Sequence, residues 1–99
     1  MKMKLFPGQK EEYIKRHAEI WPELRSLLKD AGVEDYSIFL DEESNVLFAV
    51  LTITNERAME ELPSSPIMKK WWSYMKDIMD TNADHSPVSI PLEEVFFMK

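Results

Sequence analysis

The segment EEYIKRHAEIWPEL, residues 11–24, holds the side chain best suited to proton transfer near neutral pH, His17. Histidine both donates and accepts a proton close to pH 7, which is what general acid/base catalysis requires. On a helix, Tyr13 and His17 are one turn apart and share a face. The same face continues toward the C-terminus as an apolar stripe, which comprises Ile20, Leu24, Leu27, Leu28 and Ala31.

This stripe predicts that His17 faces a sheet and not water, because the apolar face of a helix packs on the core. The charged side chains nearby fall largely on the other faces, namely those of Lys15, Arg16, Glu19, Glu23 and Arg25. Spacing alone leaves two interpretations of His17 open. It is either a core histidine that hydrogen-bonds a backbone carbonyl, or a general acid/base in a cleft lined by aromatic side chains.

The segment MKKWWSYMKDIM, residues 68–79, contains two adjacent tryptophans, Trp71 and Trp72. Helical neighbours point about 100° apart, so one flat surface does not easily hold both. Two apolar stripes run side by side here, one of Ile67, Trp71, Tyr74 and Ile78 and one of Met68, Trp72, Met75 and Met79. Together they span roughly 160°, more than the ~100° of an ordinary surface helix. Either core and a dimer contact cover this helix, or the indoles wall a pocket that suits the face of a sugar.

The elements that position these residues follow from apolar periodicity and from proline and glycine. Pro22 should kink the first helix or begin a second segment near Trp21, and Gly32 is expected to close it. The predicted elements are a strand at 1–6, a helix at 9–31, a hairpin of 36–40 and 46–53, helices at 56–62 and from Ser64 or Ser65 to Asp80, a loop at 81–91 and a last strand at 92–98. This β-α-β-β-α-β order predicts an α+β protein with the ferredoxin-like arrangement, whose open sheet face a second copy should bury.

Composition narrows the partners. The 99 residues fit a single domain, residues 1–99, and 44% of them are hydrophobic, as in ordinary soluble proteins. A net charge of −6 argues against nucleic acid and an anionic membrane surface, and no apolar run approaches the ~20 residues of a membrane span. Without cysteine, and with only His17 and His85 as histidines, no metal site is expected. The N-terminal residues lack the apolar region of a secretory signal, which favours a cytoplasmic location.

Four segments together resemble the L-rhamnose mutarotase family: EEYIKRHAEIWPEL, YSIFLDEESNVLFAV, MKKWWSYMKDIM and NADHSPVSIPLEEVF. The resemblance runs from about Met3 to Met98 without gaps. It implies a ferredoxin-like, dimeric α+β barrel, a homodimer that interconverts the α and β anomers of L-rhamnose and uses no metal or organic cofactor. The family's proton-donating histidine falls on His17. Its sugar-contacting positions fall on Tyr13, Tyr36, Trp71 and Trp72.

The resemblance also has a departure and leaves alternatives. Family members usually carry a few more residues ahead of Met3, so the first strand is expected to be short, and no role is implied for His85. Opening the sugar ring needs a second proton carrier, for which Tyr36 is a candidate. The same fold hosts cofactor-independent oxygenases, and a non-catalytic sugar-binding dimer is a further possibility. Oxygen consumption would reveal the first alternative, and binding without turnover would reveal the second.

Overall fold

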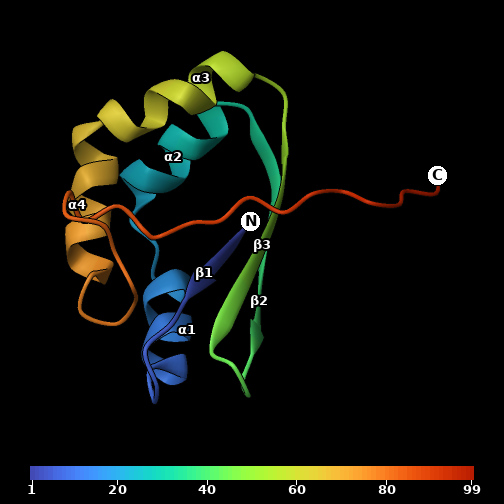
Figure 1. Cartoon of the computed structure of the whole chain (residues 1–99). Coiled ribbons are helices and arrows are strands. Elements are labelled where there is room, and N and C mark those ends of the chain that lie inside the picture. The colour runs from blue at the N-terminus through green and yellow to red at the C-terminus, as the bar shows by residue number, and fades with distance from the viewer.

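The computed structural model describes residues 1–99, the whole chain, as a three-stranded antiparallel sheet with helices on one of its faces (Figure 1). The strands are β1 (Lys2–Lys4), β2 (Val33–Asp41) and β3 (Val46–Ile53), in the spatial order β1-β3-β2. The helices are α1 (Lys10–Ala18), α2 (Pro22–Asp30), α3 (Glu56–Glu61) and α4 (Pro66–Met75), with a short 3-10 turn, η1 (Leu62–Ser64), before α4. The predicted α+β class is therefore confirmed. None of these helices is long and apolar enough to cross a membrane.

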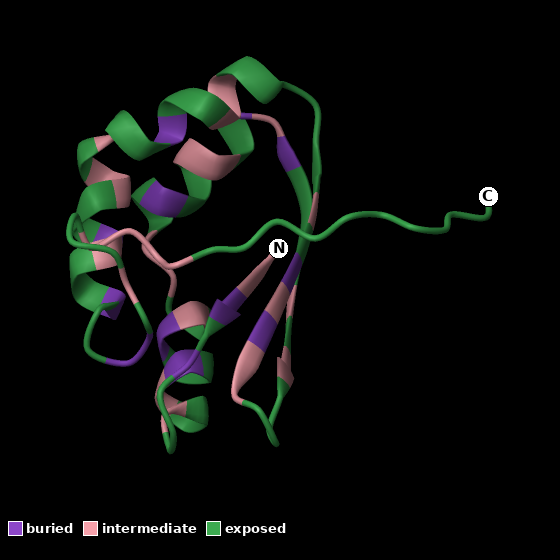
Figure 2. Ribbon diagram, viewed as in Figure 1, coloured by how far each residue is buried: buried purple, intermediate pink, exposed green.

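Side chains alternate between the two faces of the hairpin formed by β2 and β3. Leu47 and Ala49 on β3 are buried and belong to the hydrophobic core beneath the helices. On the opposite face, Phe39 is 60% exposed and Val50 is 62% exposed. Figure 2 shows the buried residues gathered where the helices face the sheet. The core therefore lies between one sheet face and the helical layer, and the other sheet face is open.

Proline divides the predicted first helix into two. α1 ends at Ala18, and α2 begins at Pro22 after Trp21 in an extended conformation with φ −60° and ψ 133°. Proline has no N–H to donate within a helix and its ring clashes with the carbonyl four residues earlier, so it starts the second helix more readily than it continues the first. Gly32 follows α2 with a φ of +94°, the left-handed conformation that closes helices. Both predictions at this helix are confirmed.

The helix that carries the two tryptophans is shorter than predicted. α4 ends at Met75 and not at Asp80. Beyond it, the carbonyl of Ile78 accepts a hydrogen bond from the Phe6 N–H at 2.9 Å, and Met79 pairs with Leu5. Residues 76–79 are therefore held by the segment that follows β1. Helical periodicity continues through these positions, but it gives no information about this distant backbone partner.

The predicted last strand, residues 92–98, is wrong for this structure. Ile90 exchanges two backbone hydrogen bonds with Lys2, at 2.8 and 2.9 Å, and the chain then leaves the sheet. Pro91 has no N–H with which to continue the pairing, and β1 begins at Lys2, so the following residues run past the strand beside which they started. Figure 1 shows this C-terminal segment extending away from the body of the protein. Leu92 is 51% exposed, and the other apolar side chains of the segment are 73–88% exposed, at Val95, Phe96, Phe97 and Met98.

Candidate active site

One cavity brings together all the site residues predicted from the sequence. It has a volume of about 620 Å³ and lies among α1, α2, α4 and the core-facing side of the sheet. Cavities of roughly 300–1,000 Å³ are typical of sites for small molecules. Its lining includes Tyr13, His17, Tyr36, Trp71 and Trp72. The rest of the wall is mostly apolar, with three charged residues, Arg25, Lys29 and Glu34, so a ligand here would meet a few polar groups in a mainly apolar surrounding.

His17 has one ring nitrogen occupied and the other available. Its Nδ1 lies 3.0 Å from the main-chain carbonyl of Tyr13. Since a carbonyl only accepts, Nδ1 carries the proton, and Nε2 has the free lone pair. Burial lowers the pKa of His17, and the hydrogen bond to Tyr13 only partly opposes this effect. His17 is therefore neutral near pH 7, and its Nε2 can act as a base. His17 shows the structural feature of each interpretation left open by spacing, because it bonds a backbone carbonyl and also lines a cavity with aromatic walls. Its acid/base role stays a prediction.

Aromatic rings fix the imidazole from two directions. The ring of Tyr13 stacks on His17 with centroids 4.2 Å apart and an interplanar angle of 25°. Trp71 from α4 meets His17 edge to face, at 5.4 Å and 88°. Trp21 in turn packs against Trp71 at 5.1 Å and 89°. Trp21 was not predicted as a site residue, although its place one turn beyond His17 is visible in the sequence, and it supports the wall from outside the cavity.

The two tyrosines of the cavity are proton donors and not bases at neutral pH. Tyr13 is 8% exposed, and burial raises the pKa of its phenol far above the ordinary value. The charge of an ionised Tyr36, which lines the same cavity, raises the pKa of Tyr13 further. Tyr36 is 41% exposed, and its partial burial also raises its pKa. The site therefore combines one neutral base with two protonated hydroxyl groups.

The adjacent tryptophans are not equivalent. Trp71 is 8% exposed and belongs to the core cluster, with edge or tilted contacts to His17, Trp21 and Tyr74. Trp72 is only partly buried and packs at the edge of that cluster. Both line the cavity. Trp71 thus joins core and site, whereas Trp72 offers a larger accessible indole face to a ligand.

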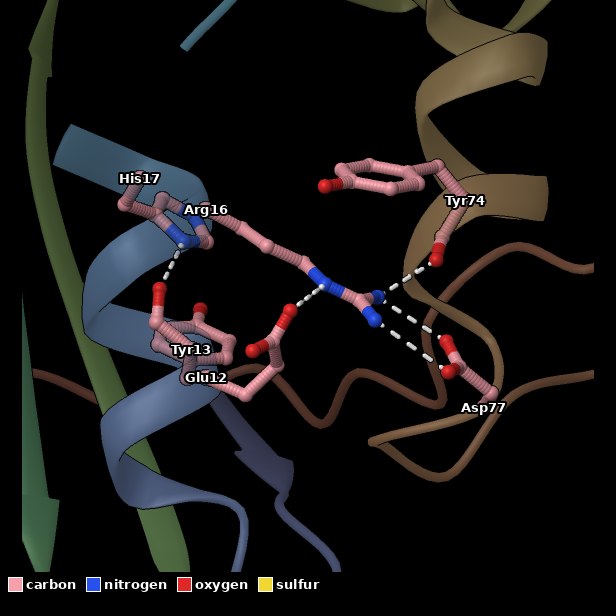
Figure 3. Close-up of polar contacts among 6 residues, drawn as sticks. All are labelled: Glu12, Tyr13, Arg16, His17, Tyr74 and Asp77. Atoms are coloured by element: carbon pink, nitrogen blue, oxygen red, sulfur yellow. Dashed lines mark hydrogen bonds and ion pairs between the residues drawn. The ribbon is translucent and has the colours of Figure 1, made fainter. Parts of the chain in front are cut away.

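Arg16 was expected on a different face of its helix from His17, but its burial there was not predicted. Arg16 is the one charged residue among the buried residues of the chain, with 9% exposure. Its guanidinium reaches across to the end of α4 and pairs with Asp77 (Figure 3). The two residues are 61 positions apart, and no local pattern in the sequence connects them.

A second cavity of about 590 Å³ lies beside the β2–β3 turn. Its lining includes Lys10, Ile14, Phe39 and Glu42, and Tyr13 is its only predicted site residue. It holds neither a histidine nor a tryptophan, so the first cavity is the better candidate for acid/base chemistry. The chain contains no group of three or more His, Cys, Asp or Glu side chains that could hold a metal ion.

Comparison with known proteins agrees with the sequence resemblance. The sequence model of the family described as L-rhamnose mutarotase matches residues 1–98. The chain belongs to the L-rhamnose mutarotase family. A protein of Mesorhizobium japonicum named L-rhamnose mutarotase is 60% identical over 97 residues, which are 98% of this chain and 92% of that protein. A second, from Formosa agariphila, is 56% identical over 98 residues and covers 99% of this chain and 94% of its own length.

A solved member of the L-rhamnose mutarotase family has the same fold. The crystal structure of L-rhamnose mutarotase FA22100 from Formosa agariphila superposes with a TM-score of 0.92 at 56% sequence identity. The match covers 99% of this chain and 94% of that one. Family membership and the overall fold therefore rest on nearly the whole length of the chain and not on the site alone.

Proposed function

We propose that this chain is an L-rhamnose mutarotase, a carbohydrate isomerase that interconverts the α and β anomers, with His17 as its acid/base. One observation carries the proposal. A neutral histidine with a free Nε2 shares a cavity with two protonated tyrosines and two tryptophans, in a member of the L-rhamnose mutarotase family. Anomer exchange needs groups that take and give protons, and the side chains of this cavity supply them.

The proposed reaction begins with proton removal from the anomeric hydroxyl by Nε2 of His17. The bond between C1 and the ring oxygen breaks, and a phenol, proposed here as that of Tyr36, donates a proton to the ring oxygen. The open aldehyde rotates about its C1–C2 bond. Reclosure on the other face returns one proton to the tyrosine and the other to the new anomeric hydroxyl, so no proton is gained or lost overall.

Binding of the sugar is assigned to the remaining residues of the cavity. An indole face contacts the C–H face of a pyranose, and an indole N–H donates to a hydroxyl. Trp72 and Trp71 are proposed to hold the ring in this way. Tyr13 is proposed to orient His17, because its ring stacks on the imidazole and its carbonyl accepts the Nδ1 proton.

We further propose a ferredoxin-like homodimer in which the open sheet faces of two copies close into an α+β barrel. The strand order β1-β3-β2 and the helices on one face are compatible with this arrangement. Phe39 and Val50 expose large apolar side chains on the uncovered face, and exposed apolar surface on one face is a feature of interaction sites. Sedimentation equilibrium, which measures the molecular mass in solution, tests the dimer. The double variant Phe39→Ser/Val50→Ser is expected to have a mass closer to that of a monomer than wild type has. A wild-type protein that sediments as a monomer would contradict it.

Two narrower predictions remain with the proposed function. A cytoplasmic location is tested by fractionation of the cells that make the protein. Activity without nucleic acid or membrane lipid is tested by assaying the purified chain alone.

The experiment for the activity is NMR exchange spectroscopy between the two anomeric protons of L-rhamnose. Wild type, His17→Ala and a sample without protein are compared, and circular dichroism checks that the variant is folded. Wild type is expected to accelerate exchange, and folded His17→Ala is expected to lose the acceleration. His85→Ala is the matched control, since it removes the other histidine, which lies outside the cavity and contacts Ser73.

Each result has a clear meaning. Wild type that binds rhamnose without accelerating exchange would replace the mutarotase by a sugar-binding module. Full acceleration by folded His17→Ala would keep the activity and remove His17 from its role. Oxygen consumption with an aromatic substrate, without any effect on rhamnose, would favour an oxygenase.

A further inference from the structure

Arg16 combines burial with a fixed charge next to the proposed acid/base. Its side chain is 10% exposed, although a charged group is rarely buried unless it is paired. It directly precedes His17 in α1. The guanidinium bonds partners in two separate parts of the chain, one in α1 and the others at the end of α4. Arg16 therefore links these two helices.

The main partner is Asp77, which lies just beyond α4. Nη1 and Nη2 of Arg16 bond the two carboxylate oxygens of Asp77 at 2.9 and 3.2 Å, so the pair is bidentate (Figure 3). Nε bonds Glu12 within α1 at 3.0 Å. The guanidinium holds the pKa of Asp77 below its ordinary value, because the hydrogen bonds favour the ionised carboxylate. Two parallel hydrogen bonds fix the orientation of the guanidinium relative to the carboxylate, which a single contact does not.

The second attachment is the end of α4 itself. Nη1 also donates to the main-chain carbonyl of Tyr74 at 2.6 Å, and the guanidinium lies 4.4 Å from the centre of the Tyr74 ring. Ile78, four positions on, donates to Met75 instead, so the Tyr74 carbonyl is available to Arg16. A cation is favoured at this helix end, where the carbonyl dipoles point. The carbonyl of Ile78 accepts a hydrogen bond from the Phe6 N–H. The turn that Arg16 contacts is therefore also hydrogen-bonded to the segment after β1.

These contacts set the spacing of the two helices that form the site. Arg16 and His17 are neighbours on α1, and Tyr74 lies one turn after Trp71 on α4. The edge-to-face contact of His17 with Trp71 therefore depends on how α1 is fixed against the end of α4. We infer that Arg16, through Asp77 and the Tyr74 carbonyl, is a positioning residue that holds His17 against Trp71 for the reaction proposed above.

Arg16 has no direct part in the chemistry. Four of its five N–H groups are used by Glu12, Tyr74 and Asp77, and its side chain does not line the cavity. It therefore acts through His17 and Trp71.

The first readout of this inference is the position of His17, measured without any sugar. The chain has two histidines, so its imidazole Hε1 protons give two NMR signals, which His17→Ala and His85→Ala assign. Ring currents from Tyr13 and Trp71 shift the His17 signal. Arg16→Lys and Asp77→Asn are expected to move it toward the value of free imidazole, because the Trp71 contribution falls. The His85 signal is expected to stay in place and serves as the internal reference.

The second readout separates positioning from binding. For Arg16→Lys and Asp77→Asn, kcat for anomer exchange is expected to fall about 10- to 100-fold, as for a reacting group displaced by about 1 Å. KM is expected to change less than about threefold, since the cavity wall is retained. In a double-mutant cycle, Asp77→Asn is expected to add little to Arg16→Met, because both break one link. Lys10→Met is the matched control, since it removes the ion pair of α1 in which Arg16 takes no part, with Glu42, and this pair does not involve α4.

The inference is overturned if folded Arg16→Lys and Asp77→Asn leave both the His17 signal and kcat unchanged while lowering only the melting temperature. It is also overturned if Lys10→Met moves the signal and kcat as much as they do. The proposed function fails separately, when wild type does not accelerate exchange. In that case the NMR signal of His17 still decides whether Arg16 positions it.

Discussion

We expect Trp71 to contribute mainly to stability and Trp72 mainly to sugar binding, and alanine substitutions distinguish the two roles. Trp71 is 8% exposed, sits in the core cluster and contacts three other aromatic rings. Truncating a buried tryptophan to alanine costs about 3–5 kcal/mol of unfolding free energy. A domain of this size has only about 5–15 kcal/mol in total. Trp72 is only partly buried, and half of the ~1.5–3 kcal/mol for full burial of a large side chain is about 1 kcal/mol.

The difference of at least about 2 kcal/mol is large enough to measure. At about 4–8 °C per kcal/mol for a domain of this length, Trp71→Ala should melt at least about 8 °C below Trp72→Ala. Thermal and urea unfolding followed by circular dichroism provide the stabilities, and Trp71→Phe keeps the comparison possible if Trp71→Ala does not fold. Anomer exchange by NMR is expected to show a raised KM for Trp72→Ala, although this variant loses only about 1 kcal/mol of unfolding free energy. Equal melting temperatures for the two alanine variants, or an unchanged KM for Trp72→Ala, would refute this division of roles.

Three further predictions concern single groups. Burial lowers the pKa of His17, and its neutral form is the proposed base. After subtraction of the uncatalysed rate, kcat/KM should therefore fall at low pH, with a midpoint below the ordinary histidine pKa of about 6.5. A midpoint above about 6.5 would contradict this. Tyr36→Phe should lower kcat about 100-fold, because it removes the proposed proton donor. Tyr13→Phe should lower kcat less than about tenfold. A larger loss in Tyr13→Phe than in Tyr36→Phe would instead assign the proton donor to Tyr13. Gly32→Ala should lower the free energy of unfolding in urea by at least about 1–3 kcal/mol, because φ at Gly32 is +94° and the added Cβ would lie 2.6 Å from Oγ1 of Thr54. Gly8→Ala should lower it less, because an added Cβ there would meet no atom within 4 Å.

Local sequence rules predicted those parts of the fold whose cause lies within a few residues. Pro22 divides the first helix because of its own ring and missing N–H, and Gly32 ends it because it adopts a positive φ. An apolar run and a segment rich in Val, Ile, Leu and Thr located the hairpin. Its second strand has the predicted bounds, Val46–Ile53, and its first strand, Val33–Asp41, is longer than the predicted 36–40. Each of these features depends on backbone conformation that one residue and its neighbours specify.

The errors arose where a distant partner decides the outcome. α4 stops at Met75 because the following residues bond the segment after β1, and residues 92–98 form no strand because no strand of the chain continues beside them. Arg16 is buried on its face of the helix because it pairs with Asp77, 61 residues away, and no local pattern predicts that partner. Periodicity assigns a residue to a face, but it does not say which element will meet that face.

The sequence by itself determined the side chains of the candidate site and the family to which they belong. Their types and spacing, together with the resemblance, were enough to name His17 and the four aromatic residues that line the cavity with it. Only the tertiary structure decided the state of those groups. The tautomer and lowered pKa of His17, the unequal burial of Trp71 and Trp72, and the link through Arg16 all depend on how α1 packs against α4. Burial and hydrogen bonding are properties of that packing, and they set protonation and geometry where sequence spacing sets only proximity along one helix.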